Sequence, residues 1–116
     1  MIRKECPSYP IIIFMAGDGN AAMDYARRYC DERGLCVKVT PTTYVYTGGK
    51  EDGFAVGLIN YPRFPKAVNA LWEIAEDLAA YLRERLYQDS YTIQAPDRTV
   101  WVSHRNTTLQ STGGEG

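Results

Sequence analysis

A run of five apolar residues, Ile11–Met15, limits the folds open to this chain more than any other segment. The run is rich in β-branched and aromatic side chains and ends at Gly17, so it predicts a β-strand rather than a helix. Both faces of that strand are apolar, which is typical of an interior strand covered on two sides. The remaining segments must therefore supply neighbouring strands and a helical cover.

Two amphipathic patterns predict the helices. Gly17–Asn20 turns the chain, with Asp18 or Asn20 as the N-cap of a first helix. Apolar residues then recur at helical spacing from Ala22 to Cys30, and Gly34 supplies a left-handed stop. Apolar residues in steps of three and four between Val68 and Leu86 predict a second helix.

Four further strands are expected around these helices. Residues 37–47 alternate in polarity, and Pro41 marks an edge or a bend because proline cannot donate to a ladder. A turn over residues 48–53 leads to a returning strand over residues 54–60. A final hairpin is predicted from residues 91–95 and 99–104.

The predicted order is β-α-β-β-α-β with an extra C-terminal strand. Right-handed crossovers then give an α+β, ferredoxin-like two-layer sandwich, with both helices on one face of an antiparallel sheet. An alternative is another α+β strand order with the last hairpin as a separate ribbon. We expect one domain over residues 1–105 and a flexible C-terminal tail over residues 106–116, which is rich in Ser, Thr and Gly.

Composition narrows the function classes. The 116 residues carry a formal net charge of −1, which gives no basic footprint for nucleic acid or an anionic membrane. Three cysteines and no secretory leader pattern indicate reduced thiols and a cytoplasmic location. Cys30 and Cys36 lack metal-ligand spacing with each other or with His104, so we expect no metal site, and no cofactor motif is present.

The sheet face turned away from the helices carries the predicted function. Alternation along the strands places large apolar side chains there, which favours a binding surface. The occupant is expected to be another protein, a second copy forming a homodimer, or a segment of the chain itself. The residues predicted on this face are Ile12, Phe14, Tyr44, Tyr46 and Trp101, joined by either Phe54, Val56 and Leu58 or Ala55, Gly57 and Ile59. Of the two sets, we assign Phe54 to the binding surface.

A stiff loop adds two more candidate binding residues. The prolines at 62 and 65 flank Arg63 and Phe64 and restrict their conformations, which lowers the entropy lost on contact. Together with the aromatic face, this loop favours a non-enzymatic protein-binding module, such as a small accessory inhibitor of a larger protein machine.

An enzyme or ligand-binding protein is the alternative from a different class. Its candidate anion- or ligand-binding turn is Asp18, Gly19 and Asn20, where a strand meets the start of a helix. Cys36, Arg63 and His104 would be further candidates for chemistry in such a protein.

Two segments of the sheet support a second alternative. Residues 13–17 and 53–56 resemble the paired strands of the RNA-recognition motif, whose β-α-β-β-α-β fold stacks bases on aromatic side chains. The resemblance implies RNA or single-stranded DNA as a partner. Val56 and Leu58 stand where that family has aromatic residues, and Asp52 stands where it has a basic one.

Overall fold

The computed structural model describes residues 1–105, and the predicted C-terminal tail at 106–116 lies outside the described residues. Residues 1–105 form two helices and five strands. In chain order they are β1 (Ile11–Ala16), α1 (Gly19–Arg33), β2 (Lys38–Tyr46), β3 (Gly49–Leu58), α2 (Val68–Arg85), β4 (Ser90–Gln94) and β5 (Thr99–Ser103).

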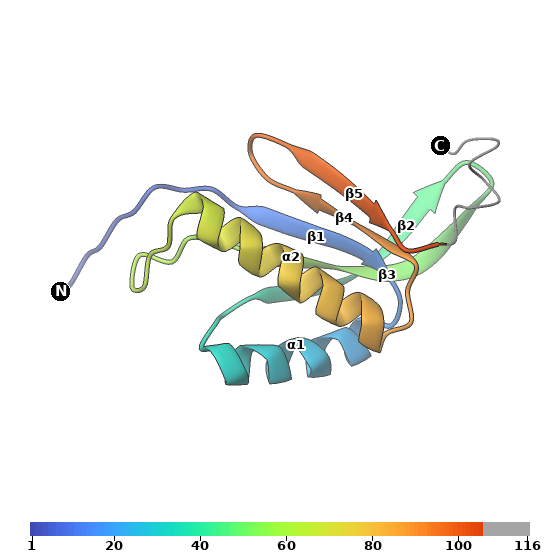
Figure 1. Ribbon diagram of the computed structural model, residues 1–116, viewed down its shortest axis with the longest axis horizontal. Coiled ribbons are helices and arrows are strands. Elements are labelled where there is room, and N and C mark those ends of the chain that lie inside the picture. Colours follow the sequence, from blue (N-terminus) through green and yellow to red (C-terminus); the bar gives the residue numbers. More distant parts are fainter. Residues whose placement is uncertain (106–116) are drawn as a thin grey trace.

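The strands form one antiparallel sheet in the order β2-β3-β1-β4-β5. Both helices lie on one face of this sheet, as Figure 1 shows, and within the described part of the chain no helix covers the other face. This arrangement confirms the predicted ferredoxin-like sandwich with an extra strand, and β5 extends the sheet beside β4 rather than forming a separate ribbon. Within residues 1–105, neither helix is long and apolar enough to cross a membrane. The cytoplasmic location stays a prediction.

The core lies between the central strands and the helices. Ile13 of β1 pairs with Val56 of β3 on one side and with Ile93 of β4 on the other, and all three side chains are fully buried. Leu78 and Leu82 of α2 close the layer from the helical side. At about 25 cal/mol per Å2 of apolar area, such side chains supply the main driving force for this sandwich.

The first helix begins and ends as the sequence predicts. The Asp18 carboxylate accepts hydrogen bonds from the backbone N–H of Asn20 at 2.9 Å and of Ala21 at 3.4 Å. Gly34 ends α1 in the left-handed region, with φ 69°, and donates its N–H to the Cys30 carbonyl. An N-cap and a left-handed glycine stop thus satisfy backbone groups that the helix leaves unpaired.

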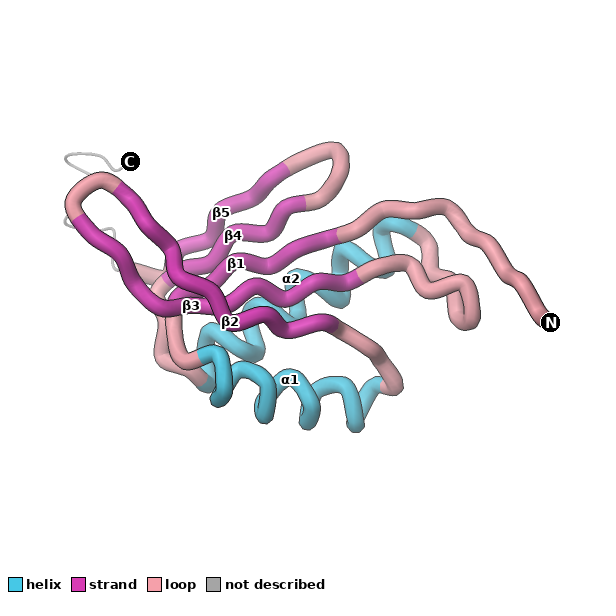
Figure 2. The backbone as a smooth tube through the Cα atoms, turned by 180° about the vertical axis from the view of Figure 1, so that it is seen from behind, coloured by secondary structure: helices cyan, strands magenta, loops and turns pink. Residues whose placement is uncertain are grey.

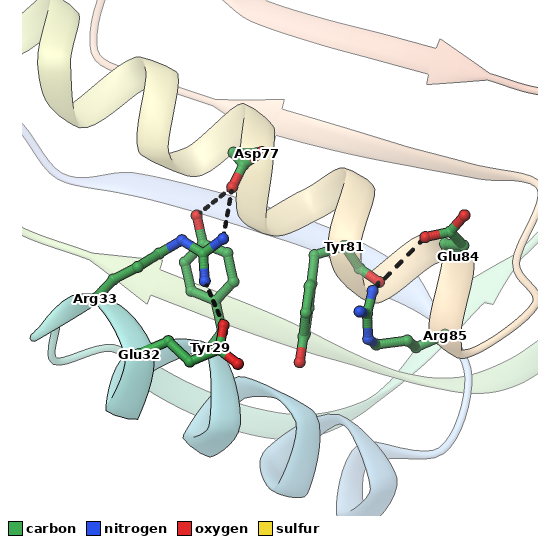
Figure 3. A network of polar contacts seen from close by, with 7 residues as sticks. All are labelled: Tyr29, Glu32, Arg33, Asp77, Tyr81, Glu84 and Arg85. Atoms are coloured by element: carbon green, nitrogen blue, oxygen red, sulfur yellow. Dashed lines mark hydrogen bonds and ion pairs between the residues drawn. The ribbon is translucent and has the colours of Figure 1, made fainter.

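A polar cluster joins the two helices at their contact (Figure 3). The Tyr29 hydroxyl of α1 donates to the Asp77 carboxylate of α2 at 2.6 Å, and Arg33 stacks over the Tyr29 ring. Tyr81 of α2 packs edge-on against the same ring, with centroids 5.1 Å apart. These contacts orient α1 against α2.

The β2–β3 hairpin is longer than the sequence predicts. β3 begins at Gly49 rather than Phe54, because residues 49–52 pair with residues 43–46 instead of forming an open turn. The last pair between β1 and β3 is Ala16 with Gly53, so no strand of the described chain pairs with the hairpin beyond Gly53 on its β1 side. Figure 2 shows this arm extending past the end of β1.

Candidate functional site

The open face of the sheet carries most of the aromatic residues predicted there. Ile12 and Phe14 alternate with the buried residues of β1, and Tyr44 and Tyr46 follow the same alternation on β2. Trp101 is 65% exposed on β5. The proposed occupants, another protein or a second copy, stay predictions.

The placement of Phe54 on this face is wrong. Phe54 is fully buried in the core with Val56 and Leu58, beneath the helices. The reason is the register of β1 and β3, which pairs Met15 with Phe54 and thereby puts both on the helical side. The smaller residues Ala55 and Gly57 therefore lie on the open face.

Arg63 and Phe64 lie at the other end of the sheet. Their loop follows Leu58, which pairs with Ile11, the first residue of β1. The aromatic cluster of Phe14 and Tyr44 lies near the last residue of β1. A strand of six residues is about 17 Å long at 3.3 to 3.4 Å per residue. The structure thus does not bring this loop and the aromatic cluster into one site, and a binding role for the loop stays a prediction.

A hollow of about 330 Å3 lies on the open face at the end of β1. The hairpin arm forms one wall, and the segment that leads into β4 forms another. The lining residues are Phe14, Met15, Ala16, Tyr44, Glu51, Gln88, Asp89, Ser90, Tyr91, Thr92 and Arg105. Its volume is at the lower end of the range of small-molecule sites.

An aromatic pair forms the apolar part of this hollow. The rings of Phe14 and Tyr44 meet edge to face, with centroids 6.5 Å apart. The Tyr44 hydroxyl donates a 2.5 Å hydrogen bond to the Phe54 carbonyl, which ties the ring down to β3. Burial raises the pKa of Tyr44 above its usual value of 10.0, so the hydroxyl stays protonated at neutral pH.

Three charged side chains complete the hollow. The sequence did not predict Glu51 or Asp89 as site residues, and it suggested Arg105 near the aromatic residues only for the nucleic-acid alternative. Glu51 stands opposite Tyr44 in the β2–β3 ladder and forms no ion pair with any residue of the described chain. Asp89 and Arg105 form an ion pair at 3.5 Å, and the His104 N–H donates to the Asp89 carbonyl. Glu51 could have been located from the sequence if the hairpin turn had been placed at Thr47–Gly48. That turn pairs Tyr44 with Glu51 across the two strands.

The predicted turn at Asp18, Gly19 and Asn20 borders a second hollow of about 600 Å3. Thr43 and Asp52 line it from the side of the arm that faces away from Glu51, because successive strand residues point to opposite faces. The Asp18 carboxylate already accepts from the backbone donors of Asn20 and Ala21. An anion would have to displace this carboxylate, and a binding role for the turn stays a prediction.

The other chemically interesting side chains lie apart from these hollows. The Cys36 thiol accepts a hydrogen bond from the Tyr61 hydroxyl at 3.2 Å, near the loop that carries Arg63 and Phe64 (the distal loop). Burial raises the pKa of the Cys30 thiol, so this cysteine is a poor nucleophile. Residues 1–105 contain no group of three or more His, Cys, Asp or Glu side chains placed to hold a metal ion.

Comparison with known proteins identifies the fold more closely. The apo structure of a phage SAM lyase superposes with a TM-score of 0.65 at 15% identity, over 90% of this chain and 97% of that one. The structure of a phage SAM lyase in complex with S-methyl-5'-thioadenosine gives a TM-score of 0.60 at 13% identity, over 89% and 95%. No family model and no curated protein matches the sequence. At such low identity the likeness shows a shared fold.

This comparison corrects the predicted function. A non-enzymatic protein-binding module or inhibitor is wrong as the main interpretation, because both of these structural neighbours, which match nearly their whole length, are enzymes. The alternative of a small enzyme or ligand-binding protein agrees better with them. The resemblance to the RNA-recognition motif also weakens, because Ala55 and Gly57, rather than aromatic residues, occupy the open face of β3.

Proposed function

We propose that this chain is a small lyase that cleaves S-adenosylmethionine at its sulfonium centre and releases S-methyl-5'-thioadenosine. The fold is shared over nearly the full length with two phage SAM lyase structures, one of which holds that nucleoside. The observation that carries the proposal is the hollow at the end of β1. It combines an aromatic pair, a carboxylate that has no ionic partner among residues 1–105, and an arginine.

Each part of the substrate has a chemical counterpart in the hollow. The adenine base can stack on the ring of Tyr44, and aromatic rings are general platforms for bases. The positive sulfonium is attracted by the Glu51 carboxylate and by an aromatic face. The substrate carboxylate can pair with Arg105, whose guanidinium suits planar, bidentate recognition.

The proposed reaction breaks the bond between sulfur and the four-carbon amino acid chain. Both electrons of that bond pass to sulfur, and the sulfonium becomes the neutral thioether of S-methyl-5'-thioadenosine. A lyase does this without water, so the carboxylate oxygen of the same fragment attacks the carbon that sulfur leaves. A C–O bond replaces the C–S bond, the fragment closes to a lactone, and no proton is transferred. Arg105 would position the attacking carboxylate, and Glu51 would bind the sulfonium of the substrate before the bond breaks.

The direct test is turnover by the purified protein. S-adenosylmethionine is incubated with the wild type, with Glu51→Gln and with Glu73→Gln, and the released S-methyl-5'-thioadenosine is quantified by chromatography and mass spectrometry. Glu73 is a matched control, because it is an exposed carboxylate on α2, outside the hollow. We expect turnover by the wild type and Glu73→Gln and, at substrate concentrations below KM, at least about tenfold less by Glu51→Gln, because the Glu51 carboxylate binds the sulfonium of the substrate before that charge is lost.

Two results would count against the proposal. Release of S-methyl-5'-thioadenosine no faster than in protein-free buffer would exclude the lyase activity. Equal rates for Glu51→Gln and the wild type would place the reaction outside this hollow.

A further inference from the structure

Gly53 of β3 lies beneath the aromatic wall of the candidate site. It pairs with Ala16 of β1 and is buried, although it lies on the open face of the sheet. The cover is the ring of Tyr44: a Cβ atom added at Gly53 would meet Cε2 of that ring at 2.4 Å and Cδ2 at 2.8 Å. No side chain other than hydrogen fits between β3 and the ring as the ring now lies.

The Tyr44 ring lies over a diagonal neighbour on β3 rather than over the residue with which Tyr44 pairs. Tyr44 pairs directly with Glu51 on the arm, and Gly53 is two residues further along the same strand. Aromatic side chains reach such diagonal neighbours across a sheet. The ring therefore leans from the arm back towards β1, where it meets Phe14 and where its hydroxyl bonds to the Phe54 carbonyl.

We infer that Gly53 is a positioning residue of the site: its missing side chain lets the Tyr44 ring rest on the sheet, at the place where the adenine of the ligand stacks. This inference rests on the proposed function and adds to it the reason why the ring lies where it does. A β-carbon at this position would lift the ring away from Phe14 and into the hollow.

A purely structural role makes a different prediction. An aromatic ring laid over a glycine also stabilises the strand, and a new Cβ would meet the Met15 carbonyl at 2.5 Å regardless of Tyr44. Loss of stability alone would therefore not support the inference. The informative quantity is the ligand affinity of the folded protein, and how far its change depends on Tyr44.

The test is a double-mutant cycle read by calorimetric titration with S-methyl-5'-thioadenosine. The proteins are the wild type, Gly53→Ala, Tyr44→Ala and the double variant, with thermal unfolding to confirm that each is folded. Gly57→Ala is the matched control, since it lies on the same strand and face and its added Cβ would find no atom closer than 3.9 Å. We expect Gly53→Ala and Tyr44→Ala each to weaken binding about tenfold or more, the scale of one lost stacking contact, and Gly57→Ala to bind as the wild type does.

The double variant decides the inference. If Gly53 acts through Tyr44, Gly53→Ala has no further effect once Tyr44 is alanine, because residues that act through one contact are not additive. Independent losses that add would overturn the inference and assign the effect to the β1 backbone. A wild type that binds no S-methyl-5'-thioadenosine contradicts the proposed function itself, which is a separate result.

A second variant covers the case in which Gly53→Ala does not fold. Tyr44→Phe keeps the ring and removes only its hydrogen bond to the Phe54 carbonyl. If the missing side chain at Gly53 sets the position of the ring, Tyr44→Phe should bind S-methyl-5'-thioadenosine within about threefold of the wild type, the size of a modest hydrogen-bond loss. Binding as weak as that of Tyr44→Ala would show that the hydroxyl positions the ring and would overturn the role of Gly53.

Discussion

The two faces of the sheet each carry a cluster of tyrosine, carboxylate and arginine, and the clusters differ in how their charges are paired. On the covered face, Tyr29 is 1% exposed, its hydroxyl bonds to Asp77, and Arg33 lies 3.8 Å from the same carboxylate (Figure 3). Every charge in this cluster has its partner within the fold. Such a cluster orients the two helices, and its charged groups are already paired with one another.

On the open face, the corresponding groups stand around a hollow. Tyr44 is tied to the backbone rather than to a carboxylate, and Glu51 has no cationic partner among the described residues. The pair of Asp89 and Arg105 is more than 60% exposed on both sides. The two clusters contain the same residue types, and the difference in pairing lies at Glu51, which is why we propose the open-face hollow rather than the Tyr29 cluster as the ligand site.

The largest effect is expected from a substitution at Phe54, which is buried between the sheet and the helices. Phe54→Ala should lower the free energy of unfolding by about 3–5 kcal/mol, because it leaves a cavity in a fully buried position. Urea unfolding followed by circular dichroism measures this. A loss below about 1 kcal/mol would place Phe54 on the surface, as the sequence interpretation had it.

The next effect concerns the charged rim of the hollow. Arg105→Ala should weaken binding of S-adenosylhomocysteine about tenfold or more, because a charge-assisted hydrogen bond to the ligand carboxylate is lost. S-methyl-5'-thioadenosine lacks that carboxylate and should bind as before. Calorimetric titration of both ligands separates the two cases.

Arg63→Ala provides the control for this prediction, because Arg63 is an exposed arginine on the distal loop. It should bind both ligands like the wild type. An equal loss of both ligands in Arg105→Ala would mean that Arg105 supports the fold of the site rather than reading the carboxylate.

The cluster of Tyr29, Arg33 and Asp77 is expected to make the free energy of unfolding depend on pH. Burial, followed by the hydrogen bond to Asp77, raises the pKa of Tyr29 far above its usual value of 10.0. The folded protein then keeps a proton that the unfolded chain releases, so this contribution to stability is complete below about pH 10 and is lost as the pH rises above it. Tyr29→Phe should cost about 1 kcal/mol at pH 8.

Comparison of the two proteins at pH 8 and pH 11 isolates Tyr29, because its hydroxyl is the one titratable group by which they differ. The difference in the free energy of unfolding between wild type and Tyr29→Phe should shrink at pH 11. A difference that stays constant would show that the Tyr29 hydroxyl and Asp77 do not interact in solution.

The smallest effect is expected on the open face. Trp101→Ala should change the free energy of unfolding by no more than about 0.5 kcal/mol, because its side chain is 65% exposed and contacts little of the core. Thermal unfolding measures this. A loss of several kcal/mol would indicate that something covers Trp101 in solution, as the predicted protein partner or second copy would.

The sequence was a good guide to the elements and a poor one to the site. The helical periodicities, the Asp18 cap and the Gly34 stop act over a few residues, so a local pattern is enough to identify them. The start of β3 was placed too late because the Gly, Lys, Glu and Asp residues at 49–52 have low strand propensity. Their pairing with residues 43–46 overrides that preference.

The composition and patterning of the chain by themselves determined an α+β sandwich, because a strand with two apolar faces and two amphipathic helices can bury their surfaces together in few ways. Only the tertiary structure decided which face Phe54 takes, since alternation is symmetric and the register between β1 and β3 selects one of its two solutions. It also brought Glu51, Asp89 and Arg105 together from three distant segments. Their proximity depends on long-range strand pairing, which no local pattern encodes.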